Sequence, residues 1–317
     1  MAAADDELLA LLLPSKGRLL DLLLTLSLVP LKAQKGYRVH FVVCANYNPA
    51  QLALLRRLFS ARATFIDEGK LEPRGMTGAY NYALEEAIRK GARWVALWAD
   101  DLLPEKRAWL DQLFPVIADA GFRFGIFSSD EGNHKGHFGW NVFADFPCAH
   151  FFVARVEALP GYMLNPGLRA YVSDNEIAIS RVKAGVPVDL LPVRVIHQPT
   201  FNQTRTANSP AYRSDLEKFY QIHPELRGRL DPIVLHADVA DANCRFVVDD
   251  GRVLRFGDST PRLGIEEFKA AAPFAAPRFS LRVVGYIRKA WNEWIASPGR
   301  VVRGAVGLVT RLRRGIA

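Results

Sequence analysis

Cysteine is scarce in this chain of 317 residues, and nothing suggests that its cysteines act in pairs. The three cysteines, Cys44, Cys148 and Cys244, are far apart, odd in number and form no CxxC pair. Zinc knuckles and disulfide-rich secreted domains both depend on paired cysteines. The scarcity therefore argues against both classes and favours a reducing compartment, the cytoplasm.

The chain also lacks an apolar run long enough to cross a bilayer, which takes roughly 20 residues. Its leucine-rich start is interrupted at Pro14, and Asp5, Asp6 and Glu7 stand where a secretion signal would carry positive charge. We therefore expect a cytoplasmic protein that is either soluble or peripheral at the inner face of the cell membrane.

Glycine-rich phosphate loops are missing as well. No G-x-G-x-x-G motif follows a predicted strand, which argues against a Rossmann dehydrogenase. The segment PSKGR at 14–18 contains one glycine, whereas a nucleotidyltransferase that makes sugar nucleotides should have a glycine-rich loop there. The segment therefore argues against a sugar nucleotidyltransferase, which stays open as one alternative function.

The net positive charge comes from one part of the chain. The net charge is +8, and residues 278–317 alone contain nine Lys or Arg and one acid, Glu293, so the remainder sums to zero. A nucleic-acid-binding enzyme would spread such charge along its groove, so no nucleic-acid partner is predicted. Apolar residues of this tail recur at helical spacing and include Trp291 and Trp294, which suits an anionic membrane surface. The alternatives are a helix packed on the rest of the chain or a homodimer interface.

What the chain has in quantity is hydrophobic residues, 50% of the total, which is ample for a packed core. In the first two-thirds, short apolar runs alternate with amphipathic stretches, the pattern of a βαβ fold with a largely parallel sheet. The predicted strands are 9–13, 37–44, 63–66, 93–99, 123–128, 149–154 and 186–196. The predicted helices run from the turn at 14–18 to about 28, then over 49–60, 78–90, 104–118, 175–183 and about 212–219.

Two adjacent acids, Asp100 and Asp101, directly follow the predicted buried strand 93–99. In an α/β sheet, ligands bind beyond the carboxyl ends of the strands. Adjacent carboxylates repel each other unless a cation shares the site, and Mn²⁺ or Mg²⁺ bridging to a diphosphate would do so. The alternative is that the pair caps the predicted helix 104–118.

Three segments stand out along the chain: LLLPSKGRLLDLLLTL, GMTGAYNYALEEAIRKGARWVALWADD and VSDNEIAISRVKAGVPVDLLPVRVIH. Taken in this order, they resemble three parts of the inverting, sugar-nucleotide-dependent glycosyltransferases of family 2. These parts are the opening strand with its Pro-Ser/Thr-x-x-Arg turn, the helix and strand leading into Asp-x-Asp, and the Glu-Asp-x-x-Leu-x-x-Arg helix with a strand ending in His. The resemblance covers roughly residues 9–198. It implies an α/β protein of GT-A fold, with a mixed, mostly parallel sheet flanked by helices and a C-terminal helical extension.

The resemblance also implies roles for single residues. Asp101 matches the metal-binding Asp of Asp-x-Asp, and His197 matches a His that contacts the metal or the leaving diphosphate. Asp174 matches the general base of the family. The implied cofactor is Mn²⁺ or Mg²⁺, and the implied nucleotide-sugar contacts are Pro14, Ser15, Arg18, Asn46 and Asp100.

The chemistry of sugar transfer requires these residue types independently of the family. The transition state is oxocarbenium-like and the leaving diphosphate is doubly charged, so a metal offsets charge worth several kcal/mol. A carboxylate beside the acceptor hydroxyl can accept its proton, which typically contributes about 10²–10⁴-fold. Since this base must lie on the sugar face opposite the leaving group, it should come from a separate segment, as Asp174 does.

The chain departs from the family pattern at several positions. Ala99 stands where the first Asp of Asp-x-Asp would be, Ser173 replaces the Glu beside the base, and residues 44–48 lack the usual acidic cluster. A Gln-x-x-Arg-Trp motif of processive synthases is absent, which favours single addition. Plain structural roles stay open for three residues, namely capping for Asp174, burial for His197 and a solvated first turn for Arg18.

The stretch 131–146 is rich in Gly, His, Asn and aromatic residues, which suits a binding loop, and we expect His137 and Trp140 to shape the acceptor pocket. The predicted domains are a catalytic domain at 1–210, with a nucleotide-sugar half at about 1–102 and an acceptor half at about 103–210, then an accessory α/β segment at 211–272 and the basic amphipathic tail at 273–317.

Together these observations predict a metal-dependent inverting glycosyltransferase that moves a sugar from a nucleoside-diphosphate sugar to a glycan or lipid-linked acceptor. Because Ala99 and Ser173 break the family pattern, a non-catalytic binding or scaffold protein on a degenerate transferase fold is the second alternative.

Overall fold

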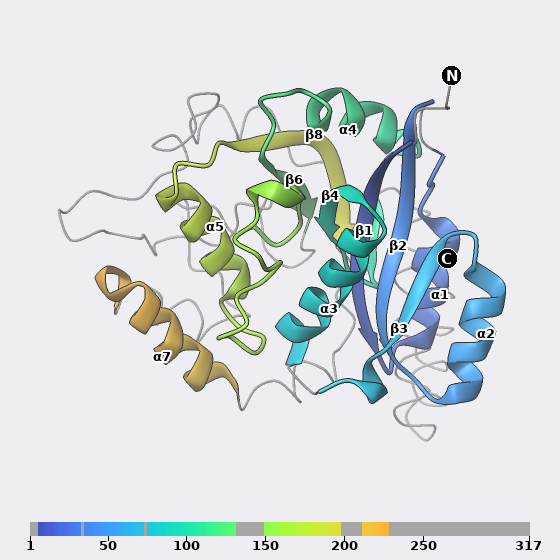
Figure 1. The fold of residues 1–317 in the computed structure, drawn as a ribbon, viewed down its shortest axis with the longest axis horizontal. Coiled ribbons are helices and arrows are strands. Elements are labelled where there is room, and N and C mark those ends of the chain that lie inside the picture. Colours follow the sequence, from blue (N-terminus) through green and yellow to red (C-terminus); the bar gives the residue numbers. More distant parts are fainter. Residues whose placement is uncertain (1–5, 33–34, 73–74, 131–148, 198–210, 228–317) are drawn as a thin grey trace, which may run out of the picture.

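The computed structural model describes residues 6–32, 35–72, 75–130, 149–197 and 211–227 of the chain. They form an eight-stranded sheet with the strand order β3-β2-β1-β4-β7-β6-β8-β5 and with helices packed around it (Figure 1). The strands are β1 (Glu7–Lys16), β2 (Tyr37–Asn46), β3 (Ala63–Asp67), β4 (Ala92–Leu97), β5 (Leu102–Pro104), β6 (Phe124–Asp130), β7 (Phe152–Arg155) and β8 (Val188–His197). The helices are α1 (Leu19–Leu28), α2 (Pro49–Phe59), α3 (Gly75–Arg89), α4 (Trp109–Ile117), α5 (Ser173–Lys183) and α7 (Tyr212–Ile222), with short 3₁₀ turns η1 (Glu68–Lys70), η2 (Val156–Ala158) and η4 (Pro224–Leu226).

The first half of the sheet is parallel. β1 pairs with β2 along its whole length and with β4 as far as the Leu12–Leu97 pair, while β3 pairs with β2. Parallel neighbours need crossover connections, which α1, α2 and α3 supply. The carboxyl ends of β1, β2, β3 and β4 therefore meet at one edge of the sheet, the lower edge in Figure 1.

The second half of the sheet is mixed. β7 is antiparallel to β4 and to β6, β6 and β8 are parallel, and β5 is antiparallel to β8. Four of the seven strand pairings are thus parallel, which confirms the predicted α/β class with a mixed, mostly parallel sheet flanked by helices.

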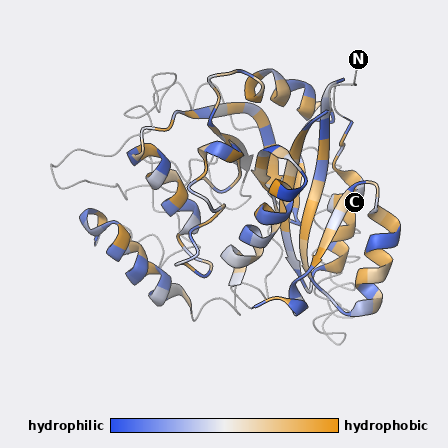
Figure 2. Ribbon diagram, viewed as in Figure 1, coloured by the Kyte–Doolittle hydropathy of each residue, from blue (hydrophilic) through white to orange (hydrophobic). Residues whose placement is uncertain are grey.

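The hydrophobic core lies between the central strands and the helices that cover them. Residues 9–13 of β1 are completely buried, because a parallel sheet with helices on both faces needs apolar side chains on both sides. Figure 2 shows the middle parts of the central strands as hydrophobic and their ends as more hydrophilic, whereas α7 alternates between hydrophilic and hydrophobic residues. Trp94, Trp98 and Trp109 are among the largest fully buried side chains, so the core extends from β4 to α4.

The strands and helices predicted within the described residues are confirmed with shifted ends, and the helix over 104–118 starts later than predicted. Leu102–Pro104 instead forms β5, which pairs with residues 195–197 of β8, and α4 begins only at Trp109. The helix is thus confirmed over 109–117, and only its predicted start at 104 was wrong. The pairing partner of β5 lies far along the chain, and a local apolar pattern carries no information about it.

The predicted turn at 14–18 is shorter than expected. β1 continues through Lys16, so Pro14 and Ser15 lie in the strand. Pro14 has no amide hydrogen and cannot donate a hydrogen bond to a neighbouring strand. The pairing of β1 with β4 already ends at Leu12 and Leu97, so Pro14 interrupts no hydrogen bond on that side of β1. The turn itself rests on Gly17, whose φ of 68° is a left-handed conformation that favours glycine.

Several sequence predictions fall on residues outside the described ranges. These are the loop 131–146 with His137 and Trp140, the accessory α/β segment beyond residue 227 and the basic tail at 273–317. Within the described ranges, no helix has both the length and the apolar character needed to cross a membrane.

A close contact between β6 and β8 gives a stability test. A Cβ atom on Gly125 would lie 2.7 Å from Leu191 Cδ2 and 2.9 Å from Phe122 Cε2. We expect Gly125→Ala to lower the free energy of unfolding by about 1–3 kcal/mol, as overpacking does in a filled core. Urea denaturation measures this, with Gly69→Ala at an exposed turn as the control, for which the change should stay within about 0.5 kcal/mol. Equal stabilities for the two variants would contradict the packing described for β6.

Candidate active site

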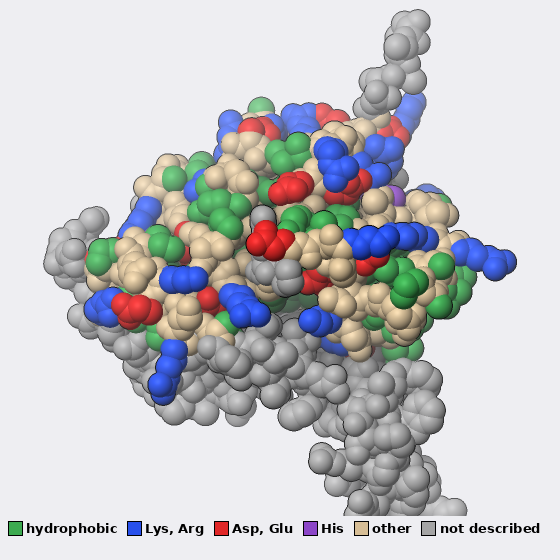
Figure 3. All heavy atoms as spheres, turned by 60° about the horizontal axis from the view of Figure 1, so that its bottom comes forward, with side chains coloured by type: hydrophobic (Ala, Val, Ile, Leu, Met, Phe, Trp, Pro, Cys, Tyr) green, Lys and Arg blue, Asp and Glu red, His purple; other side chains and the backbone are tan. Residues whose placement is uncertain are grey.

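Acidic side chains lie at the edge where the parallel strands end. The face of the molecule that includes this edge carries acidic and basic side chains with apolar ones between them (Figure 3). Asp100 and Asp101 follow β4 and are nearly fully buried, with 4% and 2% of their surface exposed. A pair of carboxylates this deeply buried needs nearby positive charge or hydrogen-bond donors.

Arg18 and Ser15 supply that positive charge and one of those donors. Arg18 Nη2 lies 2.6 Å from Asp100 Oδ1 and 2.5 Å from Asp101 Oδ2. Ser15 Oγ donates to Asp100 Oδ2 at 2.7 Å, across 85 positions of sequence. Four of the residues predicted to hold the donor and its metal therefore meet in one cluster, which we call the acidic cluster (Ser15, Arg18, Asp100 and Asp101).

Neither acid is a helix cap, so the capping alternative is wrong. The helix that follows, α4, begins at Trp109, its N-cap position is Ala108, and β5 lies between it and the acids. The same contacts exclude a solvated role for Arg18, whose side chain is 16% exposed and engaged with both carboxylates.

The electrostatics of the acidic cluster leave a surplus of negative charge. Arg18 Nε also lies 3.3 Å from the fully buried Asp21, so three carboxylates surround one guanidinium. Burial would lower the pKa of Arg18, but Asp101, Asp100 and Asp21 raise it overall. Burial raises the pKa of Asp100 to about 6, with Asp101 adding to the rise and Arg18 and Ser15 opposing it. A further cation would therefore stabilise the ionised form.

The backbone around the acids is held by buried hydrogen bonds. Thr25 Oγ1 of α1 donates to the Asp100 carbonyl oxygen at 2.7 Å, and Tyr80 Oη of α3 donates to the Trp98 carbonyl oxygen at 2.7 Å. The Trp98 amide donates to Leu12 of β1 at 2.9 Å, which extends the β1–β4 alignment past the end of β4. Helices on both sides of the sheet thus fix where the two carboxylates point.

These residues fit a divalent cation. Mn²⁺ and Mg²⁺ prefer carboxylate oxygens, and the acidic cluster has more carboxylates than positive charges. Among the described residues, no three His, Cys, Asp or Glu side chains are grouped as a complete metal site. The second predicted ligand, besides Asp101, is His197, whose backbone pairs with Leu102, the residue after Asp101. The side chain of His197 is outside the description, so its ligand role stays a prediction.

Beside the acidic cluster, the ends of β2 and β3 carry polar residues. Asn46 lies opposite Lys16 at the end of β2, and burial raises the pKa of Glu68 in η1, with Lys16 and Asn46 opposing the rise. Tyr47, the next residue, shares a 2.6 Å hydrogen bond with Ser15 Oγ, and burial raises its pKa. Glu68 and Tyr47 were missed at the sequence level, although both lie within three residues of the end of a predicted strand and so close to the expected edge.

Asp174 lies in the first turn of α5, on a different segment from the acidic cluster. Its Oδ2 is 3.2 Å from His150 Nε2, and its Oδ1 accepts from the Asn175 amide at 3.0 Å. The side chains of Asp174 and His150 are 29% and 25% exposed, so solvent or a small molecule can reach them. The N-cap position belongs to Val172, so capping does not account for Asp174. The pairing with His150 had no signal in the sequence.

The placement of His150 puts this pair toward the same sheet edge as the acids. β7 runs antiparallel to β4, with Val153 opposite Ala96, so β7 starts at the edge where β4 ends. His150 precedes β7 by two residues, and the Ala149 amide donates to the Asp174 carbonyl oxygen at 3.3 Å. The sheet topology therefore brings the acidic cluster and the Asp174–His150 pair to one edge.

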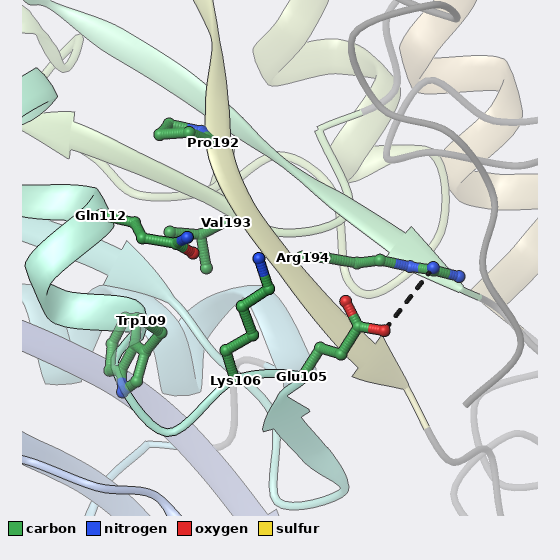
Figure 4. Close-up of a pocket in the computed structure, with 7 residues that line it drawn as sticks. All are labelled: Glu105, Lys106, Trp109, Gln112, Pro192, Val193 and Arg194. Atoms are coloured by element: carbon green, nitrogen blue, oxygen red, sulfur yellow. Dashed lines mark ion pairs between the residues drawn. The ribbon is translucent and has the colours of Figure 1, made fainter. Parts of the chain in front are cut away.

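A shallow pocket lies elsewhere, between α4 and β8 (Figure 4). Glu105 and Arg194 form a 3.8 Å ion pair on its wall, with Lys106 and Trp109 beside them. It contains none of the predicted site residues, and its polar wall offers no arrangement for nucleophilic or acid–base chemistry.

No protein-family model matches the chain, and no curated protein matches it. Among solved structures, it is similar to a mannosyltransferase from Pyrobaculum calidifontis in complex with GDP-Man and Mn²⁺, at 14% identity, a TM-score of 0.49, and 94% of this chain and 86% of that one covered. It is similar to glucosyl-3-phosphoglycerate synthase from Mycobacterium tuberculosis with Mn²⁺ and UDP, at 12% identity, a TM-score of 0.47, and 68% and 79% covered. It is also similar to mannosyl-3-phosphoglycerate synthase from Rubrobacter xylanophilus, at 16% identity, a TM-score of 0.46, and 70% and 76% covered. With similarity this low, what the protein does has to rest on its own residues.

The acidic cluster makes a prediction about stability. Arg18→Gln should lower the free energy of unfolding by about 3–5 kcal/mol in EDTA, because it leaves buried carboxylates without their cation. Urea denaturation at pH 7.5 measures the loss. Arg89→Gln, which removes an exposed partner of Glu86, is the matched control and should cost less than about 1 kcal/mol. Similar losses in both variants would show that Arg18 does not hold the pair.

Proposed function

We propose that this protein is a metal-dependent inverting glycosyltransferase of GT-A type. It would move a sugar from a nucleoside-diphosphate sugar to a glycan or lipid-linked acceptor, one sugar at a time. The observation that carries this proposal is the acidic cluster, in which residues from two of the three family-like segments meet at the carboxyl edge of parallel strands. Ligands of α/β sheets bind at that edge.

The acidic cluster is suited to a donor diphosphate with its metal. Bound Mn²⁺ or Mg²⁺ would neutralise charge on the leaving diphosphate as the sugar departs. Asp101, with Asp100 beside it, offers oxygens for that cation, and His197 would complete the set. Arg18 is already cationic and buried among them, so it can also bind a phosphate oxygen by charge-assisted hydrogen bonds.

The nucleoside of the donor fits the neighbouring strand ends. Asn46 and Glu68 offer amide and carboxylate groups to a base or a ribose, and Tyr47 offers a ring and a hydroxyl beside Ser15. Pro14 lies opposite Cys44 in the β1–β2 pairing, two residues before the strand ends. Residues 44–48 lack the acidic cluster of the family, but Glu68 of η1 offers a carboxylate in the same region. This departure from the family pattern therefore does not disfavour nucleotide binding.

Asp174 is the group that we assign as general base. In the transfer step, the acceptor oxygen forms a bond to the anomeric carbon as the bond to the diphosphate breaks, and the hydroxyl proton passes to a carboxylate oxygen of Asp174. His150 holds that carboxylate from one side at 3.2 Å and so restricts its orientation. A base on α5 and a leaving group at the acidic cluster come from separate segments, as inversion requires.

The donor assignment predicts metal-dependent nucleotide binding. UDP or GDP should bind the wild type in Mn²⁺ and much more weakly in EDTA, and Asp101→Asn should weaken binding in Mn²⁺ by about 10–100-fold or more. Isothermal titration calorimetry measures both. Asp111→Asn, on the exposed side of α4, removes the same charge away from the cluster and should leave binding unchanged. Nucleotide binding that ignores both the metal and Asp101 would refute the donor site.

The base assignment predicts a loss of rate without a loss of donor binding. Asp174→Asn should slow Mn²⁺-dependent hydrolysis of UDP-glucose or GDP-mannose, with water as acceptor, by about 10²–10⁴-fold. The donor Kd should change less than about two-fold, because the carboxylate acts on the acceptor side. Glu157→Gln on η2, 61% exposed, is the control and should keep the wild-type rate. If Asp174→Asn loses donor binding while its fold is intact, Asp174 is not the base.

Arg18 also supports an alternative function, in which its guanidinium permanently takes the place of the metal and the protein binds nucleotide without catalysing transfer. That protein would bind nucleotide equally well in Mn²⁺ and EDTA and would hydrolyse no donor. A sugar nucleotidyltransferase would instead release pyrophosphate from a nucleoside triphosphate and a sugar 1-phosphate. The titrations and hydrolysis assay above separate these outcomes from a transferase.

The acceptor and the place of action stay at the level of prediction. His137 and Trp140, proposed for the acceptor, and the basic tail, proposed for an anionic membrane surface, lie outside the described residues. A lipid-linked acceptor would give such a tail a purpose, since both would then meet at the inner face of the membrane.

A further inference from the structure

We propose that Asp215 of α7 is a positioning residue for Asp174, so that α7 belongs to the catalytic apparatus although it follows the family-like region. This inference rests on the proposed function of Asp174 as general base. It starts from a buried carboxylate that no part of the transfer chemistry uses.

Asp215 is 1% exposed and binds a short stretch of backbone. Its Oδ1 accepts from the Arg169 amide at 2.9 Å, and its Oδ2 accepts from the amides of Ala170 and Tyr171 at 2.8 and 2.9 Å. Three backbone donors engage both oxygens of this carboxylate, which restricts the positions of the side chain and of the backbone it binds. Asp215 therefore determines the conformation of residues 169–171.

That backbone leads directly into the base. The next residue, Val172, has φ 52° and ψ 10°, a left-handed conformation that is rare for a β-branched residue and costs about 1–3 kcal/mol. α5 begins at Ser173, and Asp174 lies in its first turn. Strain of this kind persists only where the surroundings impose it, and the three hydrogen bonds to Asp215 stand immediately before it.

The same loop is held from the other side by α3. Thr77 Oγ1 donates to the Leu168 carbonyl oxygen, and the Thr77 amide donates to the Arg169 carbonyl oxygen at 3.3 Å. Gly75 leaves no room for a side chain, since its Cβ would lie 2.6 Å from the Arg169 carbonyl oxygen. The loop is therefore held between α3 and α7. Among the contacts of the described residues, the hydrogen bonds from the amides of residues 169–171, directly before Val172, go to Asp215 alone.

A further contact ties α5 to the end of α7. Lys183 at the end of α5 pairs with Glu225 of η4 and lies 3.1 Å from His223 Nδ1. α5 is thus attached to the α7–η4 segment at both ends, by Asp215 before its first turn and by Lys183 in its last. A change in the position of α7 would move the helix that carries Asp174.

The test uses the full chain and donor hydrolysis with UDP-glucose or GDP-mannose in Mn²⁺. We expect Asp215→Asn to lower kcat about ten-fold or more with the donor KM unchanged, because the base moves while the donor site does not. In an Asp174→Asn background, the same change should lower kcat no further, since Asp215 acts through Asp174. The control is Glu217→Gln, a change on α7 like Asp215→Asn, which removes an exposed ion-pair partner of Arg227. This variant should keep the wild-type kcat.

Amide hydrogen exchange supplies a readout that does not depend on activity. Asp215→Asn should speed exchange at residues 169–176 and leave residues 92–101 unchanged. If this variant does not fold, Asp215→Glu, which keeps the charge but displaces the carboxylate, should show the same selective loss of kcat.

Unchanged exchange at 169–176, a rise in KM with kcat kept, or an equal further loss in the Asp174→Asn background would each overturn the inference. Its failure is distinct from failure of the proposed function. Wild-type hydrolysis by Asp174→Asn would reject the general base itself, whereas a slow Asp174→Asn with a normal Asp215→Asn would reject only the positioning role.

Discussion

The structure depends on one buried interaction, the guanidinium of Arg18 held between Asp100 and Asp101. The two acids stand at the end of β4 with almost no access to water, where unpaired carboxylates would be strongly unfavourable. Arg18 can reach them only because β1 continues through Lys16 and turns at Gly17, and because β1 and β4 are paired in register. The sheet, the turn and the charge balance are therefore parts of one constraint.

α3 connects the interaction of Arg18 with Asp100 and Asp101 to the segment that carries Asp174. From one face it donates to the backbone before Asp100 through Tyr80, and from its start it holds the loop before α5 through Thr77. Asn81 of the same helix bonds the backbone of Met163 and Leu164 at the beginning of that loop. One helix thus relates the proposed donor site to the proposed base, although their residues lie far apart along the chain.

Much of the fold and part of the candidate site follow from local sequence. Apolar runs bounded by polar turns locate most strands, and acids placed directly after a strand locate the carboxyl edge, which is how Asp100 and Asp101 were predicted. Ser15 and Arg18 were expected at the same site because their segment resembles the turn of the glycosyltransferase family. β5, His150 and Asp215 could not be found in this way. Each is defined by a partner distant in sequence, namely β8, Asp174 and the backbone of 169–171, and neither periodicity nor residue type carries information about such pairings.

The internal counter-ion also bears on how the chain acquires its active form in a cell. With Arg18 supplying positive charge at the buried acids, the polypeptide can finish folding before any divalent cation arrives. Under the proposed metal dependence, abundance and metallation are separate quantities, and a cell short of manganese would still accumulate folded but inactive protein. Supply of the ion, rather than synthesis or turnover of the chain, would then set how much of the protein is active.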